Sequence, residues 1–280
     1  MSAIAVAKKD FRDAVRSRTL LALTALFGLF TVSGAYLASW AAEVLDGGAE
    51  TTLDLIIALQ TPAGYLVPII ALVVSYAAIA GERESGSLKF LLGLPHSRRD
   101  VVVGKILGRT GVVGVSILVG FAVGLIGLFA FVGSVLLVDY LGFTLVTLLF
   151  GLVYVCIGVG LSSMTRSTTK AAIGAFGLIV FFWFAWSILV QLLLYAVEGQ
   201  FLLEEFPDWY VTLLSLSPDA AYGSALGAVL GESGLTMSGM YGSTDELPLA
   251  ARPWFGFVVL GVWALVPLVI GILRFESIDL

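Results

Sequence analysis

Residues 81–105 read GERESGSLKFLLGLPHSRRDVVVGK, a charged, amphipathic segment that separates two long apolar runs. Around it, 59% of the chain is hydrophobic, only 12% is charged, and the mean hydropathy is +1.02. A helix needs about 20 apolar residues to cross a bilayer, and soluble cores do not contain several such runs in a chain of this length. The sequence therefore predicts an all-α membrane protein in which this segment is a loop between two spans.

Six uncharged stretches are long enough to span a membrane as helices. They are Thr19–Ala42, Leu55–Gly81, Thr110–Val138, Tyr140–Thr165, Ala171–Val197 and Pro253–Leu273. Several exceed the length that a bilayer requires, so we expect some spans to be tilted or to have buried ends. A single transmembrane domain over residues 1–280 contains all six.

The charges predict how the chain is oriented in the cell membrane. If the six runs span the membrane, all Lys and Arg residues except Arg252 lie on the same side of it, out of 15 in the chain. By the positive-inside rule, both termini and the 82–109 loop are cytosolic, and residues 198–252 are external. The external segments are rich in Asp and Glu, which a halophilic source, attraction of cationic ligands or simple sequence drift would explain.

An amphipathic stretch precedes the first span. Ile4, Ala7 and Phe11 recur at helical spacing among several Lys and Arg residues. This pattern predicts an interfacial helix over residues 1–18 that lies on the inner leaflet of the lipid bilayer. Such a helix either only fixes the topology or also borders the surface where a partner docks.

The 82–109 loop predicts two short helices joined by a turn. Leu88, Leu91 and Leu92 share one face of a helix that Pro95 ends. Ser97 and Asp100 then have capping-box spacing, so a second helix continues into the third span. We expect the leucines to be exposed and to fill a hydrophobic groove on a soluble partner. Charged residues would pair at the rim of that groove: Glu82, Glu84, Arg98 and Arg99. The alternative is a helix that rests on lipid headgroups.

The same loop matches the pattern G-E-x-E-x-G-[ST]-L-x-x-L-L-x-x-P-x-x-R followed by G-K. The matching residues are Gly81, Glu82, Glu84, Gly86, Ser87, Leu88, Leu91, Leu92, Pro95, Arg98, Gly104 and Lys105. The pattern resembles that of ABC-2 type permeases of ABC transporters. It looks most like the branch that includes the membrane subunit of the copper-site maturation transporter for nitrous-oxide reductase. Ser87 stands where that family usually has Thr, and the opening Lys8–Arg12 also resembles the family's start.

The resemblance implies that the loop is a coupling helix that docks on a separate ATP-binding subunit. It further implies two copies of that subunit, which bind ATP and Mg, a second permease copy in a homodimer, and export as the direction of transport. It leaves room for an external accessory protein. The chain has no GxxxxGK[ST] phosphate loop, so we expect no cofactor and no ATP hydrolysis of its own.

No motif in the sequence identifies the substrate. A single six-helix unit offers no obvious polar path, so we expect the route at the dimer seam, lined by spans two and five. Polar side chains in those spans include Tyr65, Ser75 and Gln191. Walls without charge favour a lipid, a hydrophobic compound or purely mechanical signalling over a small ion.

Residues 198–252 are too apolar to stand free in water. Ser217 and Pro218 fit the N-cap and first position of a helix over Asp219–Leu230. The segment resembles the short outer helices of the family, which dip back into the bilayer where protein shields their backbone. In the third span, Gly120 and Gly124 form a GxxxG pattern typical of close helix packing.

Two other function classes were weighed. An ion-coupled secondary transporter usually keeps ionisable residues in its spans, and these six runs have none, although Pro68 and Pro267 could break helices to form carbonyl sites. An intramembrane protease would need a base beside Ser233 of a GESG sequence, but the only histidine, His96, falls on the opposite side. One His and one Cys, Cys156, make no metal site. The basic clusters serve topology, so no nucleic-acid partner is expected.

Overall fold

The structure is a computed structural model, and every regular element in its described residues is helical. The described residues are 3–15, 18–45, 52–88, 97–131, 136–203, 206–231 and 248–277. The elements of the first half are α1 (Ala3–Val15), α2 (Arg18–Leu45), α3 (Thr52–Ser75), α4 (Ala80–Glu84), α6 (Arg98–Phe131) and α7 (Leu137–Met164). The elements of the second half are α8 (Thr168–Val180), the π-helical η1 (Phe181–Ala185), α9 (Trp186–Glu198), α10 (Asp208–Ser215), α11 (Pro218–Leu230), the 3₁₀ turn η4 (Leu249–Ala251) and α13 (Phe255–Ser277). The all-α prediction is confirmed.

Among the described residues, five helical segments are long and apolar enough to cross a membrane. They are Ala63–Glu84, Arg98–Ala130, Leu137–Met164, Thr168–Glu198 and Phe255–Ser277. The first predicted span forms α2, in which Leu21–Gly34 is a shorter apolar stretch. The five segments correspond to predicted spans two to six, and the complete six-span layout stays a prediction.

The chain divides into two compact units, which are described separately. One unit contains residues 1–175 and 264–280, and the other contains residues 176–263. The chain passes from one unit to the other within α8 and again within α13. The prediction of one domain over the whole chain remains untested.

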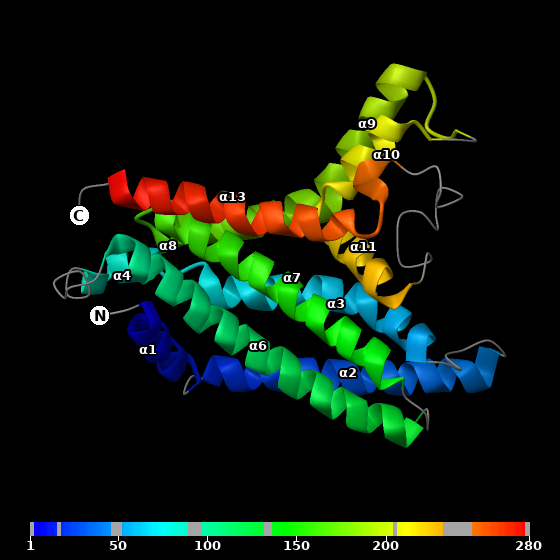
Figure 1. The fold of residues 1–280 in the computed structure, drawn as a ribbon, viewed down its shortest axis with the longest axis horizontal. Coiled ribbons are helices and arrows are strands. Elements are labelled where there is room, and N and C mark those ends of the chain that lie inside the picture. The colour runs from blue at the N-terminus through cyan, green and yellow to red at the C-terminus, as the bar shows by residue number, and fades with distance from the viewer. Residues whose placement is uncertain are drawn as a thin grey trace. The chain divides into compact units, whose positions relative to one another are not determined.

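In the first unit, α6 packs along α2 through two glycines (Figure 1). A Cβ added at Gly120 would lie 2.6 Å from a ring carbon of Phe27, and one at Gly124 would lie 2.8 Å from Cβ of Thr31. The hydroxyl of Thr31 donates a hydrogen bond to the Gly120 carbonyl at 2.8 Å, so the two backbones are in close contact. The GxxxG pattern predicted from the sequence therefore lies in a helix contact.

The second predicted span is interrupted, contrary to the expectation of one helix over Leu55–Gly81. The helix α3 ends at Ser75, and residues 76–79 form turns before α4 begins. The buried hydroxyl of Ser162, on α7, accepts hydrogen bonds from the backbone N–H groups of Ile79 and Ala80 at 3.1 and 3.0 Å. A side chain thus satisfies N–H groups that the break leaves free. By contrast, α3 continues through Pro68 and α13 through Pro267.

The second unit contains the predicted outer helices, α10 and α11. Ser217 caps α11 by accepting a hydrogen bond from the Ala220 N–H, and Pro218 occupies the first turn, which confirms that prediction. Tryptophan indoles connect the apolar helices to this segment: Trp186 donates to the Leu213 carbonyl and Trp263 to the Leu216 carbonyl. Each of these two indole N–H groups thus has an acceptor.

Candidate functional site

The N-terminal helix α1 packs directly on the first half of α6. A Cβ added at Gly104 would lie 2.6 Å from Cβ of Val6 and 2.7 Å from the Ala3 carbonyl oxygen. One added at Gly108, a turn later, would lie 2.9 Å from Cβ of Asp10. Only glycine allows the helix backbones to come this close, and the close approach brings the Asp10 carboxylate against α6.

Four charged side chains from three helices meet at this contact. Lys105 Nζ lies 2.7 Å from Asp10 Oδ1 and 2.6 Å from Glu82 Oε1. Arg109 binds the same Asp10 carboxylate, with its Nε 2.7 Å from Oδ2 and its Nη2 donating to Oδ1 at 3.0 Å. We call Asp10, Glu82, Lys105 and Arg109 the charge network. It joins α1, α4 and α6.

The charge network is largely removed from water and balanced in charge. The Asp10 and Lys105 side chains are 4% and 7% exposed, and those of Glu82 and Arg109 are 24% exposed. Two carboxylates face two cations, so the formal charge of the network is zero. Breaking a buried ion pair costs more than breaking an exposed one, because the remaining charge keeps its desolvation penalty. The network therefore specifies how α1, α4 and α6 fit together.

The described parts of the predicted loop end in defined caps. Gly86 follows α4 with φ of 76°, a left-handed conformation that favours glycine, and its N–H donates to the Arg83 carbonyl. On the other side, the Asp100 N–H donates to Ser97 Oγ at 3.1 Å and the Ser97 N–H donates to Asp100 Oδ2 at 3.1 Å. This reciprocal pair confirms the predicted capping box at the start of α6.

The charged residues predicted at a partner's rim all bind within the chain. Glu82 belongs to the charge network, and Glu84 Oε2 accepts from the Thr168 N–H at 3.1 Å at the start of α8. Arg98 and Arg99 both bind the end of α13. A further role for these four residues at a partner's surface stays a prediction.

The predicted exposure of the leucines is wrong for Leu88. Its side chain is only 1% exposed, so it is part of the protein core rather than an open face. Helical spacing places Leu88 on the same face as Leu91, but it does not show whether that face turns toward the chain or away from it. Leu91, Leu92 and Pro95 lie outside the described residues.

The residues predicted for the substrate path are described within their own units, Tyr65 and Ser75 in the first and Gln191 in the second. Tyr65 and Ser75 are ten residues apart on α3, which is roughly 15 Å along a helix. Ser75 is fully buried, donates to the Ala71 carbonyl and contacts Gly158 of α7. Gln191 donates to the Phe201 carbonyl at 2.8 Å and accepts from the Tyr210 hydroxyl at 2.6 Å. Their part in a substrate path stays a prediction.

Lys105 and Glu82 are among the site residues predicted from the sequence, but their partners Asp10 and Arg109 are not. A usable signal was present: Gly104, Gly108 and Gly111 repeat at helical spacing beside Lys105. This repeat indicates that another helix approaches α6 here. Among the described residues, no group of three His, Cys, Asp or Glu side chains could hold a metal ion.

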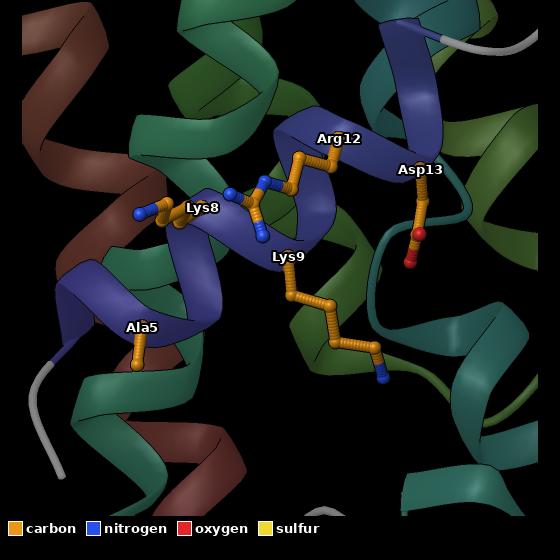
Figure 2. A pocket seen from close by; sticks show the side chains of 5 residues that line it. All are labelled: Ala5, Lys8, Lys9, Arg12 and Asp13. Atoms are coloured by element: carbon orange, nitrogen blue, oxygen red, sulfur yellow. The ribbon is translucent and has the colours of Figure 1, made fainter.

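The opposite face of α1 is basic and exposed. Figure 2 shows Lys8, Lys9 and Arg12 around a shallow hollow on this face, with Ala5 and Asp13 completing its lining. All four charged side chains are exposed, and Ile4 beside them is 68% exposed. An exposed face that mixes cations with apolar side chains is typical of an interfacial helix. The exposed face of α1 favours the inner leaflet, and the position of the helix there stays a prediction.

The close contact at Gly104 makes a specific prediction. We expect Gly104→Ala to lower the free energy of unfolding by about 1–3 kcal/mol, because the new methyl group overlaps Val6 and the Ala3 backbone. The matched control is Gly114→Ala on the same helix, where the nearest atom is 3.7 Å away. There the higher helix propensity of alanine should leave stability unchanged or raised. Denaturant titration in mixed micelles measures both, and equal stability of the two variants would contradict the contact.

Comparison with known proteins agrees with this architecture. A family model described as ABC-2 family transporter protein matches residues 4–280. The probable ABC transporter permease protein NosY of Pseudomonas aeruginosa is 30% identical over 263 residues, which cover 92% of each chain. The protein of the same name from Stutzerimonas stutzeri is 30% identical over 240 residues, which cover 80% of this chain and 84% of the relative. The match spans the charge network and both flanks of the loop, and the chain belongs to the ABC-2 family of transporter proteins.

Proposed function

We propose that the chain is the permease subunit of an ABC transporter and that ATP hydrolysis takes place on a separate subunit. Two copies of that ATP-binding subunit would pair with two copies of this chain. The 82–109 loop would dock on the ATP-binding subunit in the cytosol, and export would follow. Family membership and the multi-pass helical structure support this proposal.

The charge network is the observation that carries the proposal. Energy from a soluble subunit must reach the spans mechanically, through elements that move together. Glu82 lies on α4, just before residues 85–97, and Lys105 lies about two turns into α6, which follows them. The two side chains bind each other at 2.6 Å. The loop is therefore closed at its base by a salt bridge, and Asp10 attaches that base to α1. A loop held in this way transmits a push to its helices better than a loose one.

The purified permease alone is expected to hydrolyse no ATP, because the sequence has no phosphate loop. Adding the ATP-binding subunit that co-purifies with it should produce hydrolysis. The measurement is phosphate release by the permease, by the ATP-binding subunit and by their complex. Steady turnover by permease that is free of any ATPase would refute the proposal.

The proposed orientation can be tested by cysteine labelling in a Cys156→Ser background. We expect Ser85→Cys to react with an impermeant maleimide only from the cytosolic side and Asp245→Cys only from the outside, as the charge distribution requires. Ser85 is exposed in the structure. Labelling of position 245 only from the cytosol would reverse the orientation.

A secondary transporter is the second candidate, and buried polar groups in the spans are the feature that would favour it. The described spans do contain buried hydroxyls, such as Thr147, Ser162 and Ser163. Each of these hydroxyls already has a backbone partner within the chain, so the described structure offers little to an ion there. Transport that continues in cells without the ATP-binding subunit would favour this candidate.

A further inference from the structure

Both flanks of residues 85–97 meet at one aromatic ring near the end of the last helix. Arg83, in the last turn of α4, places its guanidinium carbon 4.6 Å from the centre of the Phe275 ring. Arg98, the first residue of α6, places its guanidinium carbon 5.7 Å from the same centre. The Phe275 side chain is fully buried, so these cation–π contacts are shielded from water and stronger than exposed ones.

Backbone and side-chain bonds reinforce the contact with α13. Arg98 Nη1 donates to the carbonyl oxygens of Phe275 at 2.6 Å and of Glu276 at 3.1 Å. Carbonyls in the last turn of a helix lack helical partners, and the negative end of the helix dipole favours a cation there. Arg99 adds a two-pronged salt bridge, with its Nε and Nη2 2.6 and 3.2 Å from the two Glu276 oxygens.

The arginine from the other flank is itself fixed in place. Arg83 Nη1 donates to the Thr165 carbonyl, just after the end of α7, at 3.0 Å. We call the contacts of Arg83, Arg98 and Arg99 with Phe275 and Glu276 the C-terminal clamp. It holds the end of α4, the start of α6 and the end of α13 together through non-covalent contacts.

The helix that the C-terminal clamp holds is tightly packed on α7 within the same unit. A Cβ added at Gly160 would lie 2.6 Å from the Pro267 carbonyl oxygen. One added at Gly271 would lie 2.7 Å from the Gly160 carbonyl oxygen. Since these are contacts between backbones, the cytosolic third of α13 cannot slide along α7 without steric overlap. A force on Phe275 therefore acts on both α13 and α7.

We infer that Phe275 is a positioning residue that transmits movement of the 82–109 loop to the last span. The inference rests on the proposed function, because the loop receives movement only if a subunit docks there. Along the chain, the loop is connected directly to α6 and, through α4, to α3. The C-terminal clamp gives the same loop a second, non-covalent route to α13 and, through it, to α7.

The contact itself is tested in the permease alone. Spin labels at Ser85→Cys and Ser277→Cys, in a Cys156→Ser background diluted with unlabelled copies, report the distance between the two helix ends. We expect a narrow distribution, which Phe275→Leu broadens and Phe275→Tyr preserves, because Leu keeps the apolar bulk but loses the ring face. An equally narrow distribution in the Phe275→Leu protein would overturn the inference. The thermal unfolding midpoint of both variants checks that the fold is intact.

Transmission is tested in the assembled complex. The distance between positions 85 and 277 should be the same without nucleotide and after trapping with ADP and vanadate, since the two ends move together. In the Phe275→Leu complex the distance should change on trapping. We subtract the ATP hydrolysis rate of the isolated ATP-binding subunit from that of each complex. The remaining rate should be roughly tenfold lower in the Phe275→Leu complex than in the wild type, while the ATP-binding subunit still co-purifies.

A wild-type distance that changes on trapping, or full hydrolysis in the Phe275→Leu complex, would overturn the inference. Failure of the wild-type permease to bind any ATP-binding subunit would instead refute the proposed function. In that case, the distance distribution between positions 85 and 277 in the permease alone still tests whether Phe275 holds the ends of α4 and α13 together.

Discussion

Replacing Lys105 with Met is expected to lower the free energy of unfolding by about 3–5 kcal/mol. The substitution removes the Lys105 cation, which binds both Asp10 and Glu82, while the methionine side chain keeps most of the apolar volume. Arg109 still pairs with Asp10, but the Glu82 carboxylate loses its salt bridge with Lys105. Its other oxygen is already buried without a hydrogen bond from any described residue. Denaturant titration of the purified permease in mixed micelles measures the loss.

The matched control for this experiment is Arg99→Met. It removes the salt bridge between Arg99 and Glu276, whose side chains are 67% and 34% exposed, so the expected loss is much smaller than that of Lys105→Met. Adding Glu82→Gln to Lys105→Met should restore part of the stability, because it removes the charge that was left alone. Equal losses from Lys105→Met and Arg99→Met would show that the charge network does not stabilise the contact of α1, α4 and α6.

Leu91→Asp is expected to abolish co-purification of the ATP-binding subunit. If Leu91 fills a hydrophobic groove on that subunit, an unpaired carboxylate there lowers the affinity roughly a hundredfold or more. The residue lies outside the predicted spans, so expression and monodispersity of the permease should stay near wild type. The measurement is the ratio of the two subunits after affinity purification and gel filtration.

Thr169→Asp is the matched control, because it adds the same charge on the predicted cytosolic side. Thr169 is exposed in the first turn of α8, where a carboxylate is favoured by the helix dipole. This variant should bind the ATP-binding subunit like the wild type. A stoichiometric complex with the Leu91→Asp permease would show that the loop is not the docking element. The secondary-transporter candidate instead expects Leu91→Asp to leave transport unchanged in cells without the ATP-binding subunit.

The sequence predicts most of the helices, because apolar runs and local caps depend on neighbouring residues. Ser97 with Asp100 and Ser217 with Ala220 are such local pairs, and both caps are present as expected. The break at residues 76–79 was missed for the opposite reason. Its stabilising group is the Ser162 hydroxyl, which lies more than 80 residues away in the sequence.

The candidate site was predicted only in part. The family pattern singled out Glu82 and Lys105, yet nothing in their spacing shows that they bind each other with Asp10 from α1. The burial of Leu88 was missed in the same way, because a helical pattern gives the side chains of one face and not the neighbour that covers it. The contacts of Arg83 and Arg98 with Phe275 join residues more than 170 positions apart in the sequence.

The difference in burial between the two sets of ion pairs has a consequence for ionic strength. Salt screens and weakens ion pairs that are exposed to water, whereas buried pairs are affected much less because mobile ions do not enter a dry protein contact. The salt bridge of Arg99 with Glu276 is open to such screening, whereas that of Lys105 with Asp10 is not. At high salt concentration, the base of the loop therefore stays bound to α1 through the buried pair of Lys105 and Asp10. Its contact with α13 then depends less on the salt bridge of Arg99 with Glu276 and more on the Phe275 ring.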